Sequence, residues 1–168
     1  MNKPTLYILT GLPFSGKTSL TRKLVKRFGF KVASMDEIMS EKGLTPDTMS
    51  QDDWNDVYAQ GYNSLKRSLS EGFSVVLDCG NLKRSERETA QRIAEGVGVS
   101  CKLIYLNISK EEAKKRWKEN RKAKFRDDLT DMTMKTALNM FEEPVLEERP
   151  IVYNQNMDLE NWIQENIA

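Results

Sequence analysis

Hydrophobic residues in the chain gather in five short runs that are separated by longer amphipathic stretches. The runs are rich in β-branched and aromatic residues, which is typical of buried strands. They predict strands over Thr5–Thr10, Phe30–Ser34, Ser74–Asp78, Cys101–Asn107 and Ile151–Tyr153. No repeat period, low-complexity tract or linker interrupts this pattern.

Between the runs, apolar residues recur at intervals of three and four, which predicts helices. In the segment 50–72, Ser50 and Asp53 form a cap signal and Gly72 ends the pattern. A second helix repeats this arrangement, with Ser85 and Glu88 as the cap signal and Gly96 at its end. Further helices are predicted after the first strand, over 110–120, around Met134–Phe141 and from Asp158 to Ile167. Strands that alternate with helices indicate βαβ units. We therefore expect an α/β fold, a three-layer α/β/α sandwich around a mostly parallel sheet covered on both faces.

Length and charge narrow the classes of protein. At 168 residues, the whole of 1–168 is expected to form one domain. The net charge of +1 argues against a surface that grips a long duplex. Histidine is absent, which excludes Ser-His or Cys-His nucleophiles and His-ligated zinc. No long apolar run and no cleavable signal are visible, so we expect a cytoplasmic protein with no membrane partner.

The stretch LTGLPFSGKTSL, residues 9–20, has the spacing G-x-x-x-x-G-K-[ST]. Glycines allow successive backbone N–H groups to turn toward phosphate oxygens, Lys17 can reach the β- and γ-phosphates, and Thr18 can offer its hydroxyl to Mg²⁺. A predicted strand precedes the stretch and a predicted helix follows it, which is the context that supports a phosphate loop. The residues expected to bind the nucleotide are Gly11, Pro13, Phe14, Ser15, Gly16, Lys17, Thr18 and Ser19.

Two carboxylates follow predicted strands. Asp78 ends the third strand, where phosphate-loop enzymes hold Mg²⁺ opposite the Thr of the loop, although it could instead cap the next turn. Asp36 lies just past the second strand and could accept the proton of an attacking hydroxyl. Its alternative role is to cap a short helix, Asp36–Glu41. Asn81 could bond a phosphate or acceptor, or serve as a turn residue.

Residues 110–126 contain nine basic and three acidic side chains. Most such runs are solvated helix faces, but three arginines flank the junction between a helix and the loosest predicted loop, residues 122–133. Arg116, Arg121 and Arg126 suit a mobile lid, at about 110–133, that closes over a triphosphate and neutralises charge during transfer.

Two other groups of side chains favour core packing over chemistry. Cys79 and Cys101 lie at the ends of apolar runs with no C-x-x-C spacing, which favours reduced thiols. Trp54, Tyr58 and Tyr62 form an aromatic stripe that could line an acceptor pocket, but core packing is the favoured interpretation.

Together, the loop, Asp36, "DCGN", "RWKENR" and "FEEPVLEE" resemble the small P-loop kinases of the group that includes polynucleotide 5′-kinase, chloramphenicol phosphotransferase and zeta toxins. Members of this group are often described as AAA-type ATP-binding predicted kinases. The resemblance implies a P-loop NTP hydrolase fold with strand order 2-3-1-4-5 and ATP with Mg²⁺ as phosphoryl donor. It further implies Lys17 and Thr18 as clamps, Asp36 as base and the arginines as lid.

The chain departs from polynucleotide kinases in two places. "DCGN" has one residue more than their D-T-N-like stretch, and Met39 or a neighbour stands where they carry a substrate-phosphate arginine. We therefore expect a kinase for a hydroxyl of a small metabolite, nucleoside or antibiotic.

Three other functions would use the same phosphate loop. A 5′-hydroxyl polynucleotide kinase and a nucleotide-binding switch module without phosphotransfer stay open as alternatives. A regulatory GTPase is disfavoured because no N-K-x-D motif is present.

Overall fold

A computed structural model describes residues 3–167 and contains one five-stranded sheet whose strands all run parallel. The strand order β2-β3-β1-β4-β5 confirms the expected order. The strands are β1 (Thr5–Thr10), β2 (Lys31–Ser34), β3 (Val75–Asp78), β4 (Ser100–Asn107) and β5 (Ile151–Asn154). Each lies within one residue of its predicted bounds, so the apolar runs located the sheet.

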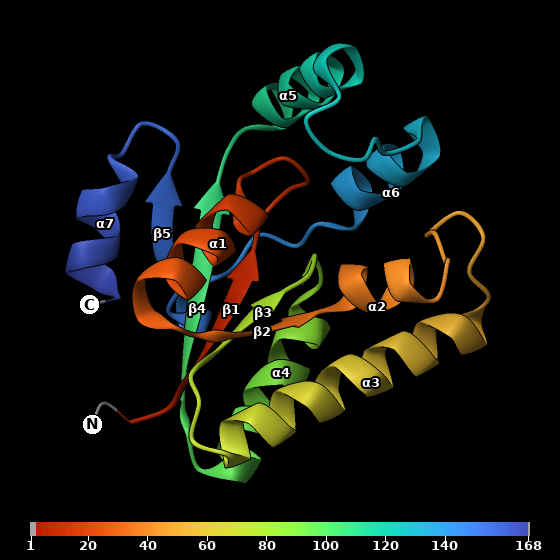
Figure 1. Cartoon of the computed structure of the whole chain (residues 1–168). Coiled ribbons are helices and arrows are strands. Elements are labelled where there is room, and N and C mark those ends of the chain that lie inside the picture. The colour runs from red at the N-terminus through yellow and green to blue at the C-terminus, as the bar shows by residue number, and fades with distance from the viewer. Residues whose placement is uncertain (1–2, 168) are drawn as a thin grey trace.

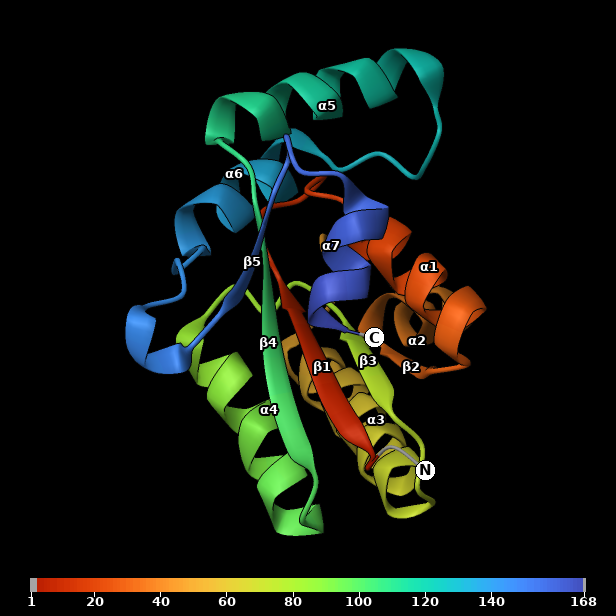
Figure 2. The same cartoon turned by 90° about the vertical axis from the view of Figure 1, so that its left-hand side faces the viewer.

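Helices cover both faces of the sheet and complete the predicted three-layer sandwich (Figures 1 and 2). The helices are α1 (Lys17–Phe28), α2 (Met35–Glu41), α3 (Gln51–Ser70), α4 (Arg84–Val97), α5 (Lys110–Ala123), α6 (Asp131–Met140) and α7 (Leu159–Asn166), with a 3₁₀ turn at Leu146–Glu148. Two separate cores result, one on each face.

The central strand β1 shows why both faces must be covered. All six of its residues are buried. Leu6 and Ile8 pack against the core beneath α3 and α4, whereas Tyr7 and Leu9 pack against the core beneath α1 and α7. This alternation follows from the two-residue period of a strand.

The caps of α3 and α4 differ in how well the sequence predicted them. Ser50 caps α3 as predicted: its hydroxyl accepts from Asp53 N at 3.2 Å, and Asp53 accepts from Ser50 N at 2.8 Å. The predicted limits of α4 were wrong. Lys83 is its N-cap residue because the Glu86 carboxylate accepts from Lys83 N, and Gly98, with a φ of 77°, ends it in place of Gly96.

A third cluster joins the phosphate loop to α5 and α6, which lie beyond the carboxyl ends of the strands (Figure 1). Leu12 and Phe14 of the loop pack there against Ala113 of α5 and against Met134 and Leu138 of α6. The two helices therefore contact the loop directly. In the described part of the chain, no helix is long and apolar enough to span a membrane.

Candidate active site

The phosphate loop takes the conformation that its two glycines were expected to allow. Gly11 has a φ of 152°, and a Cβ there would lie 2.6 Å from Leu106 O and 2.8 Å from Ser15 Oγ. Gly16 caps α1 with a φ of 101°. Phe14 adopts a φ of 65° without being glycine. The loop is thus tightly curled at the N-terminus of a helix, where backbone N–H groups favour an anion.

Lys17, the first residue of α1, folds back across the loop. Its Nζ donates to Gly11 O at 2.8 Å and to Leu12 O at 2.9 Å. Burial lowers the pKa of this ammonium to about 8, although the nearby Asp78 and Asp36 carboxylates oppose the shift. The charged form of Lys17 is therefore less stabilised at the loop than it would be by water.

Asp78 lies at the carboxyl end of β3, beside the phosphate loop that follows β1. Burial raises the pKa of its carboxyl, while the Thr21 hydroxyl and Lys17 act in the opposite direction. Asp36 and Glu37 raise it further by like-charge repulsion. The structure thus brings Asp78 into one electrostatic group with Lys17 and Asp36.

Asp36 lies in the first turn of α2, directly after β2. The helix is capped by Ser34, whose hydroxyl accepts from Glu37 N at 3.2 Å, so the Asp36 carboxylate is not needed as a cap. The Asp36 side chain is exposed to solvent, yet crowding by protein atoms still raises the pKa of its carboxyl. Arg126 and Lys17 both counteract that rise. A carboxylate poised in this way is suited to accept a proton.

The oxygen donors near the loop fit a magnesium ion. Thr18 is exposed at the start of α1, and Asp78 carries a carboxylate whose charge Thr21 and Lys17 compensate only in part. Within residues 3–167, no group of three or more His, Cys, Asp or Glu side chains forms a metal cage. Mg²⁺ rarely uses such cages, since it binds one or two protein oxygens together with substrate phosphates and water.

Two of the three candidate arginines reach the phosphate loop. Arg116 pairs with Glu112 at 2.8 Å and donates from Nη1 to Phe14 O at 3.1 Å. The Arg126 guanidinium lies over the Phe14 ring, 4.6 Å from its centroid. The charge of Arg126 also lowers the pKa of Lys17 and that of Asp36, so Arg126 belongs to the same electrostatic group.

Arg121 makes its contacts within the lid. It pairs with Asp128 at 2.9 Å and Asp131 at 2.6 Å, and it lies over the Trp117 ring at 4.1 Å. The Asn120 side chain also binds both backbone groups of Arg126. The loop between α5 and α6 is therefore held by side chains, and its mobility stays a prediction.

Asn81 is a buried turn residue, which decides between its two predicted roles in favour of the turn. It is 1% exposed and has a φ of 45°. The aromatic stripe packs partly buried against the core, as favoured, and Tyr58 donates its hydroxyl to Glu86 at 3.3 Å. Cys79 is buried and Cys101 partly buried, both as free thiols.

One contact of the lid has no signal in the sequence. Asp47, in the loop between α2 and α3, accepts from the Thr130 and Thr133 hydroxyls at 3.1 and 2.8 Å. These threonines lie at the start of α6. Asp47 carries no motif, so only the folded arrangement of the two segments reveals it.

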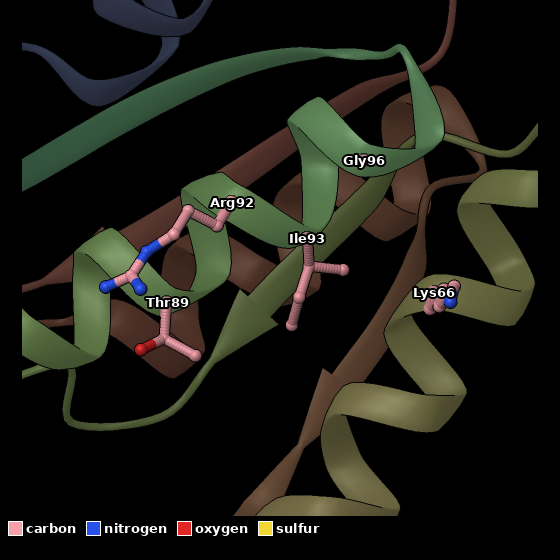
Figure 3. A pocket seen from close by; sticks show the side chains of 5 residues that line it. All are labelled: Lys66, Thr89, Arg92, Ile93 and Gly96. Atoms are coloured by element: carbon pink, nitrogen blue, oxygen red, sulfur yellow. The ribbon is translucent and has the colours of Figure 1, made fainter.

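Two surface grooves lie outside this group of charges. One, of about 340 Å³, lies between α3 and α4 (Figure 3) and is lined by Lys66, Thr89, Arg92, Ile93 and Gly96. Lys66 and Gly96 lie toward the C-terminal ends of their helices, next to the edge where β3 and β4 begin. The other groove, of about 360 Å³, lies between α5 and α6. The Asp36 and Lys17 region is therefore separate from the groove of Figure 3.

Comparisons with known proteins agree with this arrangement. A relative described as "Probable gluconokinase" of Schizosaccharomyces pombe is 25% identical over 161 residues, which is 90% of this chain and 80% of the relative. The solved structure of Chaetomium thermophilum Kti12 in complex with ADP-AlF3 matches with a TM-score of 0.74 and 19% identity, covering 95% of this chain and 94% of that one.

A second solved structure was determined with two bound molecules, AMPPNP and APS. The Mycobacterium tuberculosis APS kinase CysC in complex with AMPPNP and APS matches with a TM-score of 0.70 and 16% identity, over 99% of this chain and 97% of that one. At such identities the solved structures show a shared fold. The family profile described as AAA domain (AAA_33) matches residues 6–144. The chain therefore belongs to this AAA domain family and is a kinase-like, ATP-binding P-loop domain.

Proposed function

We propose that the protein is an ATP-dependent kinase that transfers the γ-phosphoryl group to a hydroxyl of a small molecule. The observation that carries the proposal is the placement of two carboxylates beside the loop: Asp36 directly follows β2 and Asp78 ends β3, and both lie close enough to Lys17 for its charge to lower their pKa. A binding module needs the lysine but has no use for a carboxylate placed where an acceptor hydroxyl would approach.

In the proposed mechanism, the loop amides of Gly11–Thr18 and the Lys17 ammonium hold the β- and γ-phosphates. Thr18 and, through water, Asp78 would hold Mg²⁺, which neutralises charge on the phosphates. Asp36 orients the acceptor hydroxyl and takes its proton as the oxygen attacks phosphorus in line with the leaving ADP oxygen. A carboxyl with a raised pKa accepts a proton more readily than an ordinary carboxylate.

The three lid arginines have different proposed roles. Arg126, which has no carboxylate within ion-pair distance among residues 3–167, is free to contact the transferred phosphoryl group. Arg116 supports the loop through Phe14 O. Arg121 contributes by shaping the lid through Asp128 and Asp131 rather than by touching phosphate.

A small acceptor is favoured over a polynucleotide. The polynucleotide kinases carry an arginine for a substrate phosphate where this chain has Met39 or a neighbour, and Met39 itself is 7% exposed and offers no cation. The relative in Schizosaccharomyces pombe is named a gluconokinase and the mycobacterial structure an APS kinase, and both names describe small acceptors. The 5′-hydroxyl polynucleotide kinase is the second candidate, and a steep loss of substrate affinity with salt would favour it.

The Asp36→Asn variant tests the proposal. We expect ATP affinity within about twofold of the unaltered protein, and loss of transfer by about a hundredfold or more, because a general base contributes about that factor. ADP release is measured against metabolites, nucleosides, aminoglycosides, phenicols and 5′-hydroxyl oligonucleotides. Glu37→Gln, at the neighbouring exposed carboxylate, is the matched control. Full activity in the Asp36→Asn variant would show that Asp36 is not the base, and that the reaction uses a different base or none.

A further inference from the structure

Arg87 of α4 is a buried charge that the proposed mechanism does not use. Its side chain is 3% exposed, and that of its partner Glu148 is 10% exposed. Nε and Nη2 of Arg87 donate to the two carboxylate oxygens of Glu148 at 2.7 and 3.0 Å. Burial of an ion pair costs desolvation free energy, so such a pair is a weak source of stability. Its two-point geometry, in contrast, fixes the relative position of two segments.

The remaining nitrogen of Arg87 ties further backbone to this pair. Nη1 donates to Asn81 O at 3.1 Å, Leu82 O at 3.3 Å and Glu142 O at 3.0 Å. One side chain therefore holds the turn after β3 and the segment 141–148, the "FEEPVLEE" stretch that leads from the lid to β5. The proposed mechanism leaves both of these stretches without a role.

Asn81 carries the connection to the phosphate loop. Its Nδ2 donates to Leu9 O at 2.8 Å, and its own carbonyl accepts from Thr10 Oγ1 at 2.8 Å. Leu9 and Thr10 are the last residues of β1 and stand directly before Gly11. Asn81 Oδ1 has no hydrogen-bond partner among residues 3–167, so the side-chain amide is oriented by its single bond to the strand.

The start of the loop has little freedom to absorb a displacement. Gly11 packs so closely that a Cβ would meet Leu106 O at 2.6 Å. A shift of Thr10 by a few tenths of an ångström would therefore move the loop amides relative to the Lys17 ammonium. Phosphate binding depends on the alignment of those donors.

We propose that Arg87 is a positioning residue of the nucleotide site. Through Asn81 it fixes the end of β1 and with it the phosphate loop, and through Glu148 and Glu142 O it ties that position to the segment returning from the lid. The expected effect of Arg87 on turnover rests on the proposed function. Its expected effect on nucleotide affinity does not.

The test separates position from stability. In the double variant Arg87→Met with Glu148→Leu, apolar side chains replace the pair, which often preserves stability. We expect a folded protein whose Kd for ADP with Mg²⁺, measured by calorimetry, is weakened about tenfold or more. The matched control Thr5→Val removes the Thr5–Ser100 hydroxyl contact of 2.8 Å at the opposite end of β1 and should leave the Kd unchanged.

A second variant covers the case in which the double variant does not fold. Arg87→Lys keeps a cation beside Glu148, but a single ammonium cannot bind Glu148 and the carbonyls of Asn81 and Glu142 together as the guanidinium does. A Kd weakened about tenfold again supports the proposal. In either folded variant, a Kd within about twofold of the unaltered protein overturns it. Tight ADP binding without any phosphotransfer by the unaltered protein would defeat the proposed function and leave this inference standing.

Discussion

Lys17 shows how a single residue couples the nucleotide site to pH. Its ammonium has a pKa lowered to about 8 because burial disfavours the charged form. Above that pH the nucleotide-free protein carries a neutral lysine, and nucleotide binding must then take up a proton. Affinity for ADP with Mg²⁺ should therefore decline as the pH rises through about 8.

The measurement is a calorimetric titration at several pH values between about 7 and 9.5. Lys17→Arg is the diagnostic variant, since a guanidinium stays charged across this range. Its affinity, whatever its absolute value, should vary much less with pH than that of the unaltered protein. An equally steep decline in both proteins would show that another group titrates.

Gly11 allows a prediction about backbone geometry. Gly11→Ala would place a Cβ 2.6 Å from Leu106 O at a φ of 152°, so the loop must distort. We expect nucleotide affinity to fall by about tenfold or more, together with a lower melting temperature. Gly96→Ala is the control, because nothing lies within 4 Å of its Cβ position in α4. That change should raise the free energy of unfolding by about 0.5–1 kcal/mol and leave binding intact.

For single residues, the sequence could predict which ones form the phosphate loop. It could not predict which of the lid arginines contact that loop. The fixed spacing of the motif places Lys17 and Thr18 through local geometry alone. Arg121 and Arg126 have similar local contexts, and only the tertiary positions of Asp128, Asp131 and Phe14 separate them. The buried position of Arg87 depends on Glu148, which is 61 residues away in the chain.

The elements around the lid meet at one contact that can be tested. Asp47, between α2 and α3, accepts hydrogen bonds from Thr130 and Thr133 at the N-terminus of α6. A carboxylate there also interacts favourably with the helix dipole. Asp47→Ala should loosen α6, increase proteolysis between α5 and α6, and raise the share of ATP that is hydrolysed rather than transferred.

Limited proteolysis and the ratio of released phosphate to phosphorylated acceptor measure these effects. Asp127→Ala is the matched control, because Asp127 is an exposed carboxylate in the same lid. A ratio in the Asp47→Ala variant equal to that of the control would show that this contact does not govern lid closure.

The elements themselves were predictable to different degrees. Strands β1 to β5 were located within one residue because their apolar runs are bounded by polar residues. The N-cap of α4 was misplaced by two residues, at Ser85 in place of Lys83, because Glu86 rather than Glu88 supplies the capping interaction, through Lys83 N. The contact between α6 and the α2–α3 loop lies beyond any local pattern.

For the whole molecule, sheet order and layers could be predicted because alternating strands and helices admit few arrangements. The site then costs the fold some stability. Desolvation by the surrounding protein atoms raises the pKa of the Asp78 and Asp36 carboxyls, so the native state binds protons more tightly at these two groups than the unfolded chain does. The contribution of these two carboxyls to the stability of the nucleotide-free protein must therefore fall as the pH rises above the ordinary carboxyl pKa of 3.8 and through the raised values.

Because the buried Asp78 charge lowers stability, we expect Asp78→Asn to raise the melting temperature of the nucleotide-free protein near neutral pH by a few degrees. The amide keeps the shape of the side chain and removes the charge that burial, Asp36 and Glu37 disfavour. Below about pH 3 the advantage should disappear, since the carboxyl is then protonated in both states. Calorimetric melting at both pH values measures the difference, with Asp127→Asn as an exposed control. Because Asp78 is also the proposed Mg²⁺ ligand, the Asp78→Asn variant should need far more Mg²⁺ to bind ADP. If the variant gains no stability and its Mg²⁺ requirement is unchanged, the Asp78 carboxylate lies outside the site.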